Sequence, residues 1–124
     1  MSEYKLLDSS VWIAYLFEGM FKELIENEDK LFLSALSLFE IKRKLFKKKI
    51  KKADLQDKIN FIKKRSIVLS IDGKITEKAS ELSAEKELPA IDSLIYATSF
   101  LNELKLVTLD NDFRGLPNTE VIEI

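Results

Sequence analysis

Four acidic residues of this sequence stand where a parallel α/β sheet would bring them together. Each one either closes a short apolar run or lies in the first turns of a helical pattern that follows one. They are Asp8, Glu40, Asp92 and Asp110. In open α/β sheets, ligands bind at the carboxyl ends of the strands. Carboxylates gathered there repel one another and raise each other's pKa, and a divalent cation would remove that cost.

The residue types that are missing narrow the chemistry further. The chain has no histidine and no cysteine, which excludes the ordinary tetrahedral zinc site, the Ser-His-Asp triad and the Cys-His pair. Carboxylates and hydroxyls select hard cations such as Mg²⁺ or Mn²⁺. The sequence therefore favours a magnesium or manganese site built from oxygen ligands.

Each acid also has a simpler interpretation. Asp8 could only cap the helix that follows it, and the helix dipole favours Asp92 in a first helical turn. Glu40 is the weakest candidate by spacing, because stepping about 100° per residue leaves it on the far side of the apolar arc. Arg43 or Lys44 could pair with it there. The arc consists of Leu38, Phe39, Ile41, Leu45 and Phe46.

Asp110 has better support from its neighbours. In an extended segment Thr108 and Asp110 share a face, so the hydroxyl and the carboxylate can point to one site. Asp112, two residues on, is a further possible ligand, although it could do no more than cap the turn through Phe113.

The elements expected to position these residues alternate along the chain. Apolar runs typical of strands occupy residues 4–7, 30–34, 67–71, 106–109 and 120–124. Helical patterns occupy residues 11–17, 20–27, 35–48, 53–64, 72–86 and 90–103. Ser9 or Ser10 could cap the first helix, and Ser34 or Ser37 the third. This alternation predicts one α/β domain over residues 1–124, a three-layer α/β/α sandwich with a mostly parallel sheet of four to five strands.

The composition is that of a globular domain. Hydrophobic residues make up 46% and charged residues 33% of the chain, which is unlike a disordered sequence. No apolar run approaches the roughly 20 residues that span a bilayer, and the first residues carry no secretory or transit signal. We therefore expect no membrane association and a cytoplasmic location.

Basic residues are concentrated in the middle of the chain. Residues 42–65 contain 12 of the 20 lysines and arginines, although the formal net charge is only -1. This concentration suggests a polyanion or an acidic partner, and a solvated helix face is the simpler alternative. The main candidates for binding such a partner are Lys47, Lys48, Lys49, Lys51 and Lys52.

Four segments together resemble the PIN domain family, and in particular the VapC-type ribonuclease toxins of toxin–antitoxin pairs. In chain order they are LLDSSVWI (residues 6–13), SLFEI (37–41), AIDSLIYAT (90–98) and LVTLDNDF (106–113). The resemblance extends over essentially the whole chain, and the specificity comes from the four segments in combination.

The resemblance implies an endoribonuclease that uses Mg²⁺ or Mn²⁺ to cleave single-stranded RNA. The residues that match the family's catalytic and metal-binding acids are Asp8, Glu40, Asp92 and Asp110. Asp112 matches a possible fifth acid, Thr108 matches the small polar residue beside the fourth, and Ser9 is a further possible supporting residue. The resemblance also implies a small antitoxin partner and a homodimer.

Under this interpretation, the lysine-rich segment would bind the RNA backbone, and an aromatic side chain could stack on an unpaired base. The aromatic candidates are Trp12, Tyr15 and Tyr96, for which core packing is the simpler interpretation.

Two other functions remain open. A PIN nuclease of RNA processing would have the same fold and no antitoxin. A non-enzymatic receiver-like signalling module would need a second acid pair near the first strand and a lysine at a late strand end, and neither LLDSS nor LVTLDN provides them. A Rossmann cofactor module is disfavoured because the three glycines of the chain, Gly19, Gly73 and Gly115, are too far apart to form the phosphate-binding motif.

Overall fold

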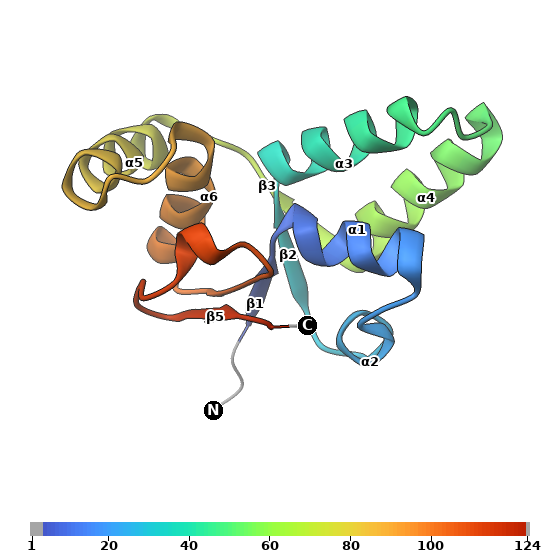
Figure 1. Ribbon diagram of the computed structural model, residues 1–124, viewed down its shortest axis with the longest axis horizontal. Coiled ribbons are helices and arrows are strands. Elements are labelled where there is room, and N and C mark those ends of the chain that lie inside the picture. The colour runs from blue at the N-terminus through green and yellow to red at the C-terminus, as the bar shows by residue number, and fades with distance from the viewer. Residues whose placement is uncertain (1–3, 124) are drawn as a thin grey trace.

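A computed structural model describes residues 4–123, which form one parallel sheet covered by helices (Figure 1). The strands are β1 (Lys5–Leu7), β2 (Leu31–Ser34), β3 (Ser66–Leu69), β4 (Lys105–Thr108) and β5 (Thr119–Val121). The helices are α1 (Ser9–Glu18), α2 (Lys22–Ile25), α3 (Ala35–Lys47), α4 (Lys52–Arg65), α5 (Gly73–Lys86) and α6 (Ala90–Leu101). A 3₁₀ turn, η1 (Asn111–Phe113), follows β4.

The order of the strands places the first and fourth side by side in the middle of the sheet. The order is β3-β2-β1-β4-β5, and every neighbouring pair is parallel. β1 pairs with β4 in register, from Lys5 opposite Lys105 to Leu7 opposite Val107. Because all strands run in one direction, their carboxyl ends lie at one end of the sheet. The segments that follow β1, β2 and β4 therefore begin close together.

Helices cover both faces of the sheet. α1, α3 and α4 lie on one side and α5 and α6 on the other (Figure 1). Leu6 and Leu7 are adjacent in the central strand and both are fully buried, yet they belong to different hydrophobic clusters. Such a strand is covered on both faces, as successive side chains point to opposite sides. The predicted three-layer sandwich is confirmed.

Two local predictions need correction. The last strand is Thr119–Val121 rather than residues 120–124, and residue 124 lies outside the described residues. The expected capping of α1 by Ser9 or Ser10 is wrong, because the helix begins at Ser9 itself with Asp8 at the N-cap position. Both hydroxyls bind carboxylates instead. They are thus part of the candidate site rather than of a helix cap.

The capping expected further along the chain is present. Ser34 Oγ accepts a hydrogen bond from the Leu36 amide at 3.1 Å and caps α3. This cap fixes the direction in which α3 leaves β2. Gly19, with φ at 67°, ends α1 in the left-handed conformation that glycine adopts without strain.

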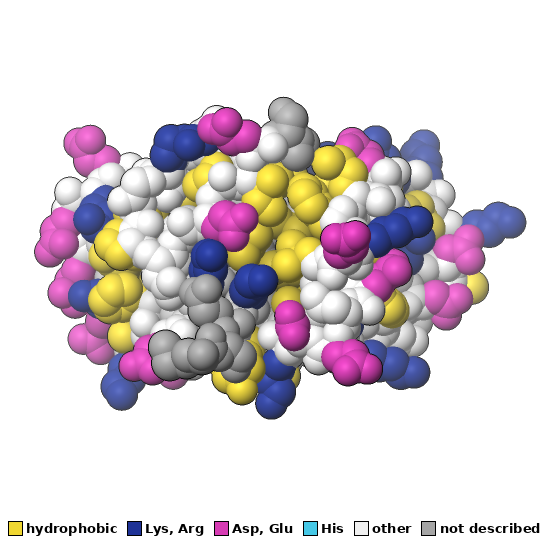
Figure 2. Space-filling model, turned by 90° about the horizontal axis from the view of Figure 1, so that it is seen from below, with side chains coloured by type: hydrophobic (Ala, Val, Ile, Leu, Met, Phe, Trp, Pro, Cys, Tyr) yellow, Lys and Arg dark blue, Asp and Glu magenta, His cyan; other side chains and the backbone are white. Residues whose placement is uncertain are grey.

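The opposite end of the sheet, where the strands begin, has a mixed surface. Figure 2 shows hydrophobic side chains there between scattered basic and acidic ones. A groove of about 500 Å³ lies between α2 and the strands β1, β4 and β5, and it is lined in part by Phe21, Leu24 and Ile122. No helix within residues 4–123 is long and apolar enough to cross a bilayer.

Candidate metal centre

Asp8 is held at the end of β1 by two hydroxyl groups. Its carboxylate is 5% exposed, and Oδ2 accepts hydrogen bonds from Thr108 Oγ1 at 2.8 Å and from Ser10 Oγ at 2.9 Å. The side chain makes no capping bond to α1, so the simpler interpretation of Asp8 as a helix cap fails. Within the described part of the chain, Oδ1 accepts no hydrogen bond, and this oxygen is free for a ligand.

The same two hydroxyls also fix the backbone that leads to Asp110. Thr108 Oγ1 accepts from the Asp110 amide at 3.0 Å, and Ser10 Oγ accepts from the Leu109 amide at 3.0 Å. Each hydroxyl therefore donates to Asp8 and accepts from the chain after β4. Together they join the ends of the two central strands. Ser10 was not a predicted site residue, because its hydroxyl was interpreted as a possible helix cap.

Asp110 and Asp112 are brought together by a tight turn. Asp110 Oδ1 accepts from the Asp112 amide at 2.9 Å and caps η1. The predicted alternative, in which Asp112 caps the turn, is wrong, since Asp110 has that position. Phe113 is fully buried and holds the turn against the core. Asp112 can therefore return its carboxylate toward the same site.

Asp92 lies across from this turn in the first turn of α6. One carboxylate oxygen from each of Asp92, Asp110 and Asp112 lies within 4.8 Å of the other two, and among residues 4–123 this is the group of acids close enough to share one cation. Asp112, which the sequence predicted only as a possible ligand, is thus one of the three acids that lie closest together. Asp8 and Glu40 lie outside this group but interact with it electrostatically. We refer to these five residues as the acid cluster.

Burial and repulsion act together on Asp92. Burial raises the pKa of Asp92 to about 7, and the four other carboxylates of the cluster, led by Asp110, contribute to the shift. The dipole of α6 favours the charged form of Asp92, but burial and the neighbouring carboxylates outweigh this effect. Within the described residues no lysine or arginine forms an ion pair with the cluster. Of residues 4–123, Arg43 is the one cation whose charge acts on a raised pKa of the cluster, at Glu40, and the negative charge of the cluster is therefore balanced only in small part.

Glu40 faces the cluster, against the expectation from its spacing. Its side chain is half-buried and accepts a hydrogen bond from Ser9 Oγ at 3.1 Å. Burial raises the pKa of Glu40, as does the charge of Asp8, whereas the Ser9 hydrogen bond and the charge of Arg43 lower it. The placement of Glu40 on the far side of α3, away from the buried part of the molecule, is wrong.

Glu40 was misplaced because the buried face of α3 differs from the one that the apolar residues predict. Ser37, Ile41 and Leu45 form that face, one helical turn apart. Phe39 and Phe46, which were assigned to the apolar arc, are 62% and 63% exposed. Removing them from the arc rotates the buried face toward Glu40. Counting all apolar residues as buried therefore placed Glu40 on the wrong side.

Other predicted contacts lie away from the cluster. Trp12 and Tyr96 are 0% and 2% exposed, so core packing is the correct interpretation for both. The five candidate lysines are exposed and lie at the turn between α3 and α4. That turn is at the far end of α3 from β2 (Figure 1). None of these residues lines the acid cluster itself.

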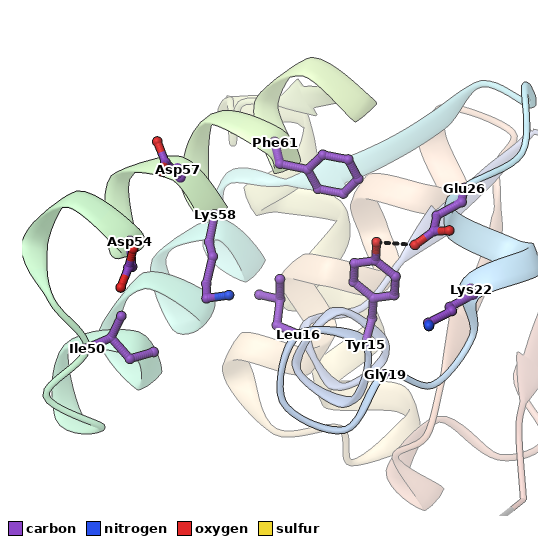
Figure 3. Close-up of a pocket in the computed structure, with 10 residues that line it drawn as sticks. All are labelled: Tyr15, Leu16, Gly19, Lys22, Glu26, Ile50, Asp54, Asp57, Lys58 and Phe61. Carbon is purple, nitrogen blue, oxygen red and sulfur yellow. Dashed lines mark hydrogen bonds between the residues drawn. The ribbon is translucent and has the colours of Figure 1, made fainter.

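Tyr15 belongs to a separate groove between α1, α2 and α4 (Figure 3). The groove has a volume of about 570 Å³, and none of its lining residues is an acid of the cluster. Tyr15 and Phe61 are stacked on one another there, with ring centroids 6.1 Å apart. The Tyr15 hydroxyl donates to Glu26 Oε2 at 2.6 Å, and burial together with this bond raises the pKa of Tyr15 to about 12.

The fold agrees with a comparison to known families. Residues 5–118 match the PIN domain. The chain belongs to the PIN domain family. No curated protein sequence matches it. As a PIN domain it belongs to a family of nucleases.

Solved structures with the same fold include proteins of toxin–antitoxin systems. A toxin–antitoxin complex from Klebsiella pneumoniae has 22% identity and a TM-score of 0.82, with 97% of this PIN domain and 99% of the other chain covered. VapBC2 from Rickettsia felis, bound to a DNA fragment from its promoter, has 21% identity and a TM-score of 0.78 over 97% and 99% of the two chains. Mycobacterium tuberculosis VapC20, a sarcin-ricin loop cleaving toxin, has 16% identity and a TM-score of 0.69 over 96% and 97%. At these identities the likeness shows the shared fold.

Proposed function

We propose that this PIN domain is a metal-dependent endoribonuclease that cleaves single-stranded RNA and is the toxin of a VapBC-type pair. The observation that carries the proposal is the acid cluster, whose carboxylates form no ion pair with a lysine or arginine of residues 4–123. Its three closest carboxylates lie within 4.8 Å of one another, and the pKa of Asp92 is raised to about 7. A protein gains nothing in stability from such repulsion, whereas a bound cation turns it into attraction.

The donor set fits a hard divalent cation. The ligand atoms are carboxylate oxygens, with hydroxyls as their supports, and this combination selects Mg²⁺ or Mn²⁺. Asp92, Asp110 and Asp112 would hold the cation, and the free Oδ1 of Asp8 would complete the set. The cation would supply Lewis-acid chemistry, since it acidifies water and neutralises charge that develops on a phosphate.

The chain's own groups would keep this site in a reactive arrangement. Thr108 and Ser10 hold the Asp8 carboxylate in one orientation. Glu40 accepts a hydrogen bond from Ser9 and its pKa is raised. In the proposed mechanism Glu40 would orient the attacking water and accept its proton. Because these hydroxyls come from β4 and α1, the carboxylates of Asp8 and Glu40 are held by two neighbouring elements of the fold.

A small antitoxin is proposed as the natural partner. The neighbours described as toxin–antitoxin complexes support this assignment. The groove between α1, α2 and α4 is the candidate contact, because its stacked Tyr15 and Phe61 offer apolar surface while Lys22, Asp54 and Lys58 line it with charge (Figure 3). Such a groove suits an amphipathic helix. A homodimer, which the resemblance implies, is proposed with it.

Cleavage of a labelled single-stranded RNA is the direct test. We expect cleavage with Mg²⁺ or Mn²⁺ and none with chelator. Asp8→Asn and Asp92→Asn should each reduce the rate by more than the roughly 10–100-fold typical of residues outside the ligand set. Glu81→Gln removes an exposed carboxylate of α5 outside the cluster and is the matched control. Undiminished cleavage by either aspartate variant would contradict the proposal.

Purification from the native host separates the toxin from a processing nuclease. A small, tightly bound protein that blocks cleavage would support the toxin assignment. Recovery of an active enzyme without such a protein would favour the nuclease of RNA processing.

A further inference from the structure

The outer side of α1 is apolar, although this helix begins at the acid cluster. Its one charged residue is Glu18, in the last position of the helix, whereas a surface helix usually carries charged residues on its outer side. Ser10, Ile13 and Phe17 occupy positions i, i+3 and i+7, so they follow one another along one side. Ser10 and Ile13 are partly buried, and Phe17 is 36% exposed. This side of α1 therefore offers apolar surface rather than charge.

The two ends of this row of residues have different chemistry. At the first end, Ser10 Oγ donates to Asp8 Oδ2 at 2.9 Å, so the row starts at the acid cluster. At the other end, Lys48 Nζ lies 5.9 Å from the centroid of the Phe17 ring. Lys48 belongs to the turn between α3 and α4, and α1 and α3 extend from the sheet toward the same side of the molecule (Figure 1). We call Ser10, Ile13, Phe17 and Lys48 the α1 track.

We propose that the α1 track binds the single-stranded RNA substrate beyond the acid cluster, with the Phe17 ring stacking on an unpaired base and Lys48 contacting a phosphate. This inference rests on the proposed nuclease function and adds the surface along which the strand leaves the point of cleavage. A ring beside a cation is a usual means of binding single strands, because every base has a π-face and every linkage a charge. The distance from Lys48 to the ring is near the 6 Å limit of a cation–π contact, so a base can approach the ring.

The position of the ring determines which nucleotide it meets. Phe17 lies seven residues after Ser10, which is about 10 Å along a helix that rises about 1.5 Å per residue. Successive nucleotides of one stacked strand are about 3.4 Å apart, and those of an extended strand are farther apart. The ring therefore meets a base within about three nucleotides of the phosphate at the cluster. A base that is paired in a duplex is not free to stack on the ring, so the track favours single strands.

The turn beside Phe17 supplies positive charge only. Residues 41–53 contain eight lysines and arginines and no acid. The lysines of the turn are exposed, and no carboxylate of residues 4–123 forms an ion pair with them. A polyanion neutralises such charge and releases counterions when it binds. An apolar helix side that leads from the acid cluster to these lysines thus fits a strand that carries both bases and phosphates.

The α1 track is separate from the groove proposed for the antitoxin. Tyr15 and Leu16 of the same helix line that groove, and neither Ile13 nor Phe17 does. The two ligands can therefore be distinguished by variants of one helix. Variants of Phe17 should change RNA binding, and variants of Tyr15 should change binding of the antitoxin.

The molecule contains a matched control on the other side of the sheet. Phe100 of α6 is 47% exposed and has Lys78 Nζ 5.0 Å from its ring centroid. This pair has the same chemistry as Phe17 and Lys48, but α6 covers the face of the sheet opposite α1 (Figure 1). An aromatic side chain that merely adheres to RNA should behave like Phe100.

The experiment measures binding separately from cleavage. A fluorescein-labelled, unstructured oligouridylate is titrated with protein in chelator, and its anisotropy reports the dissociation constant. Phe17→Leu keeps most of the apolar bulk and removes the π-face, so we expect it to bind about 10-fold more weakly, given the loss typical for one stacked base. Phe17→Tyr keeps the ring and should bind like wild type, and Phe100→Leu should be unchanged. On a duplex of the same length, Phe17→Leu should make no difference.

The cation is tested independently of the ring. Lys48→Gln changes an exposed side chain and should lower the slope of log affinity against log salt by about 0.7, for the one phosphate it no longer contacts. Because the Phe17 ring is partly buried, the thermal midpoint of Phe17→Leu is also measured, and binding is compared at a temperature at which the variant is fully folded. In cleavage with Mg²⁺, Phe17→Leu should raise KM and leave kcat unchanged, since the ring does not touch the reacting phosphate.

Each outcome separates this inference from the nuclease itself. If wild type cleaves RNA while Phe17→Leu and Lys48→Gln bind it as wild type does, the α1 track is wrong and the nuclease stands. If Phe100→Leu weakens binding as much as Phe17→Leu does, the effect is not specific to the track and the inference is overturned. It is overturned as well if Phe17→Leu changes sedimentation or loses a co-purified protein and leaves RNA affinity unchanged. If wild type neither binds nor cleaves RNA, both proposals fail.

Discussion

Ser10 joins two parts of the centre through a single oxygen atom. Its Oγ donates to Asp8 Oδ2 and accepts from the Leu109 amide. Without this hydroxyl, the Asp8 carboxylate would lose one of its hydrogen bonds and the Leu109 amide would lose its acceptor. An amide that is partly buried and unpaired costs more free energy than one that water can reach. In the proposed metal site Ser10 would therefore act on the cation through Asp8, as a positioning residue.

Ser10→Ala should weaken binding of Mn²⁺ by about 10-fold, the lower end of the effect typical of supports behind metal ligands. The cleavage rate should fall with it, and Ser10→Thr should restore both because it keeps a hydroxyl. Electron paramagnetic resonance titration of Mn²⁺ measures the affinity without RNA. Ser99→Ala is the control, since it removes a buried hydroxyl bonded only to the Tyr96 carbonyl. Equal Mn²⁺ affinity in Ser10→Ala and wild type would refute the role.

The sequence predicts the residues of this centre unevenly, for physical reasons. Thr108 could be found because the two-residue period of a strand sets it on the face of Asp110. Ser10 could not, because a serine after a strand is equally suited to cap a helix, and only the packing of α1 against β4 decides between the two. Asp112 lies near Asp92 and Asp110 because Asp110 caps the turn η1. The sequence does not predict which of the two aspartates caps this turn.

At the scale of elements, the basic segment 42–65 is divided among α3, the turn into α4, and α4 itself. The lysines of the turn are exposed, while Arg65 at the end of α4 donates to the Ile25 carbonyl and to Asn27. Arg65 thus holds the segment after α2 and is not part of a binding surface. The basic segment 42–65 therefore contains both exposed lysines and an arginine that holds part of the fold together.

Reversing charge in the turn should reduce the electrostatic part of RNA binding. Lys47→Glu/Lys51→Glu should lower the slope of log affinity against log salt by about 1.4, from two phosphates at about 0.7 each. Lys63→Glu/Lys64→Glu makes the same change at the other end of α4, and it should have a smaller effect. Filter binding at several salt concentrations measures both slopes. Equal slopes for the two pairs would mean that net charge alone, and not the turn, attracts the RNA.

The position of α3 shows where periodicity reaches its limit. The helix itself was expected from its pattern and its Ser34 cap, and both are present. Its buried face was not, because phenylalanine side chains at Phe39 and Phe46 are as apolar as any core residue and yet are exposed. The spacing of apolar residues along a helix does not tell those buried in the core from those exposed on the surface. In α3, only the contacts with the sheet and with α1 show which apolar residues are buried.

At the scale of the whole molecule, the acid cluster links folding to pH and to the cation. The pKa of Asp92 is raised in the folded state, so between its ordinary value of about 3.9 and about 7 the folded chain binds more protons than the unfolded one. The contribution of Asp92 to the free energy of unfolding therefore falls as pH rises through this range. A cation that binds only the folded state restores stability at neutral pH.

Asp92→Asn should consequently raise the thermal midpoint of the metal-free protein at pH 7 and have less effect at pH 4. The variant should also gain less from added Mg²⁺ than wild type does. Differential scanning calorimetry in chelator across pH 4–8 measures this, with Glu81→Gln as the control for loss of a carboxylate. A midpoint that changes with pH identically in Asp92→Asn and wild type would contradict the account.

The pairing of β1 with β4 has a consequence for how the protein is made. The Asp8 carboxylate and the Thr108 hydroxyl that holds it are 100 residues apart. At about 5–20 residues per second, a ribosome that has made β1 needs about 5–20 s to make β4. During that time the nascent chain carries Asp8 and Glu40 without Asp92, Asp110 or Asp112, and β1 lacks its neighbour in the sheet. A chain that stops before residue 112 therefore lacks part of the acid cluster, and premature termination leaves no fragment with a complete centre.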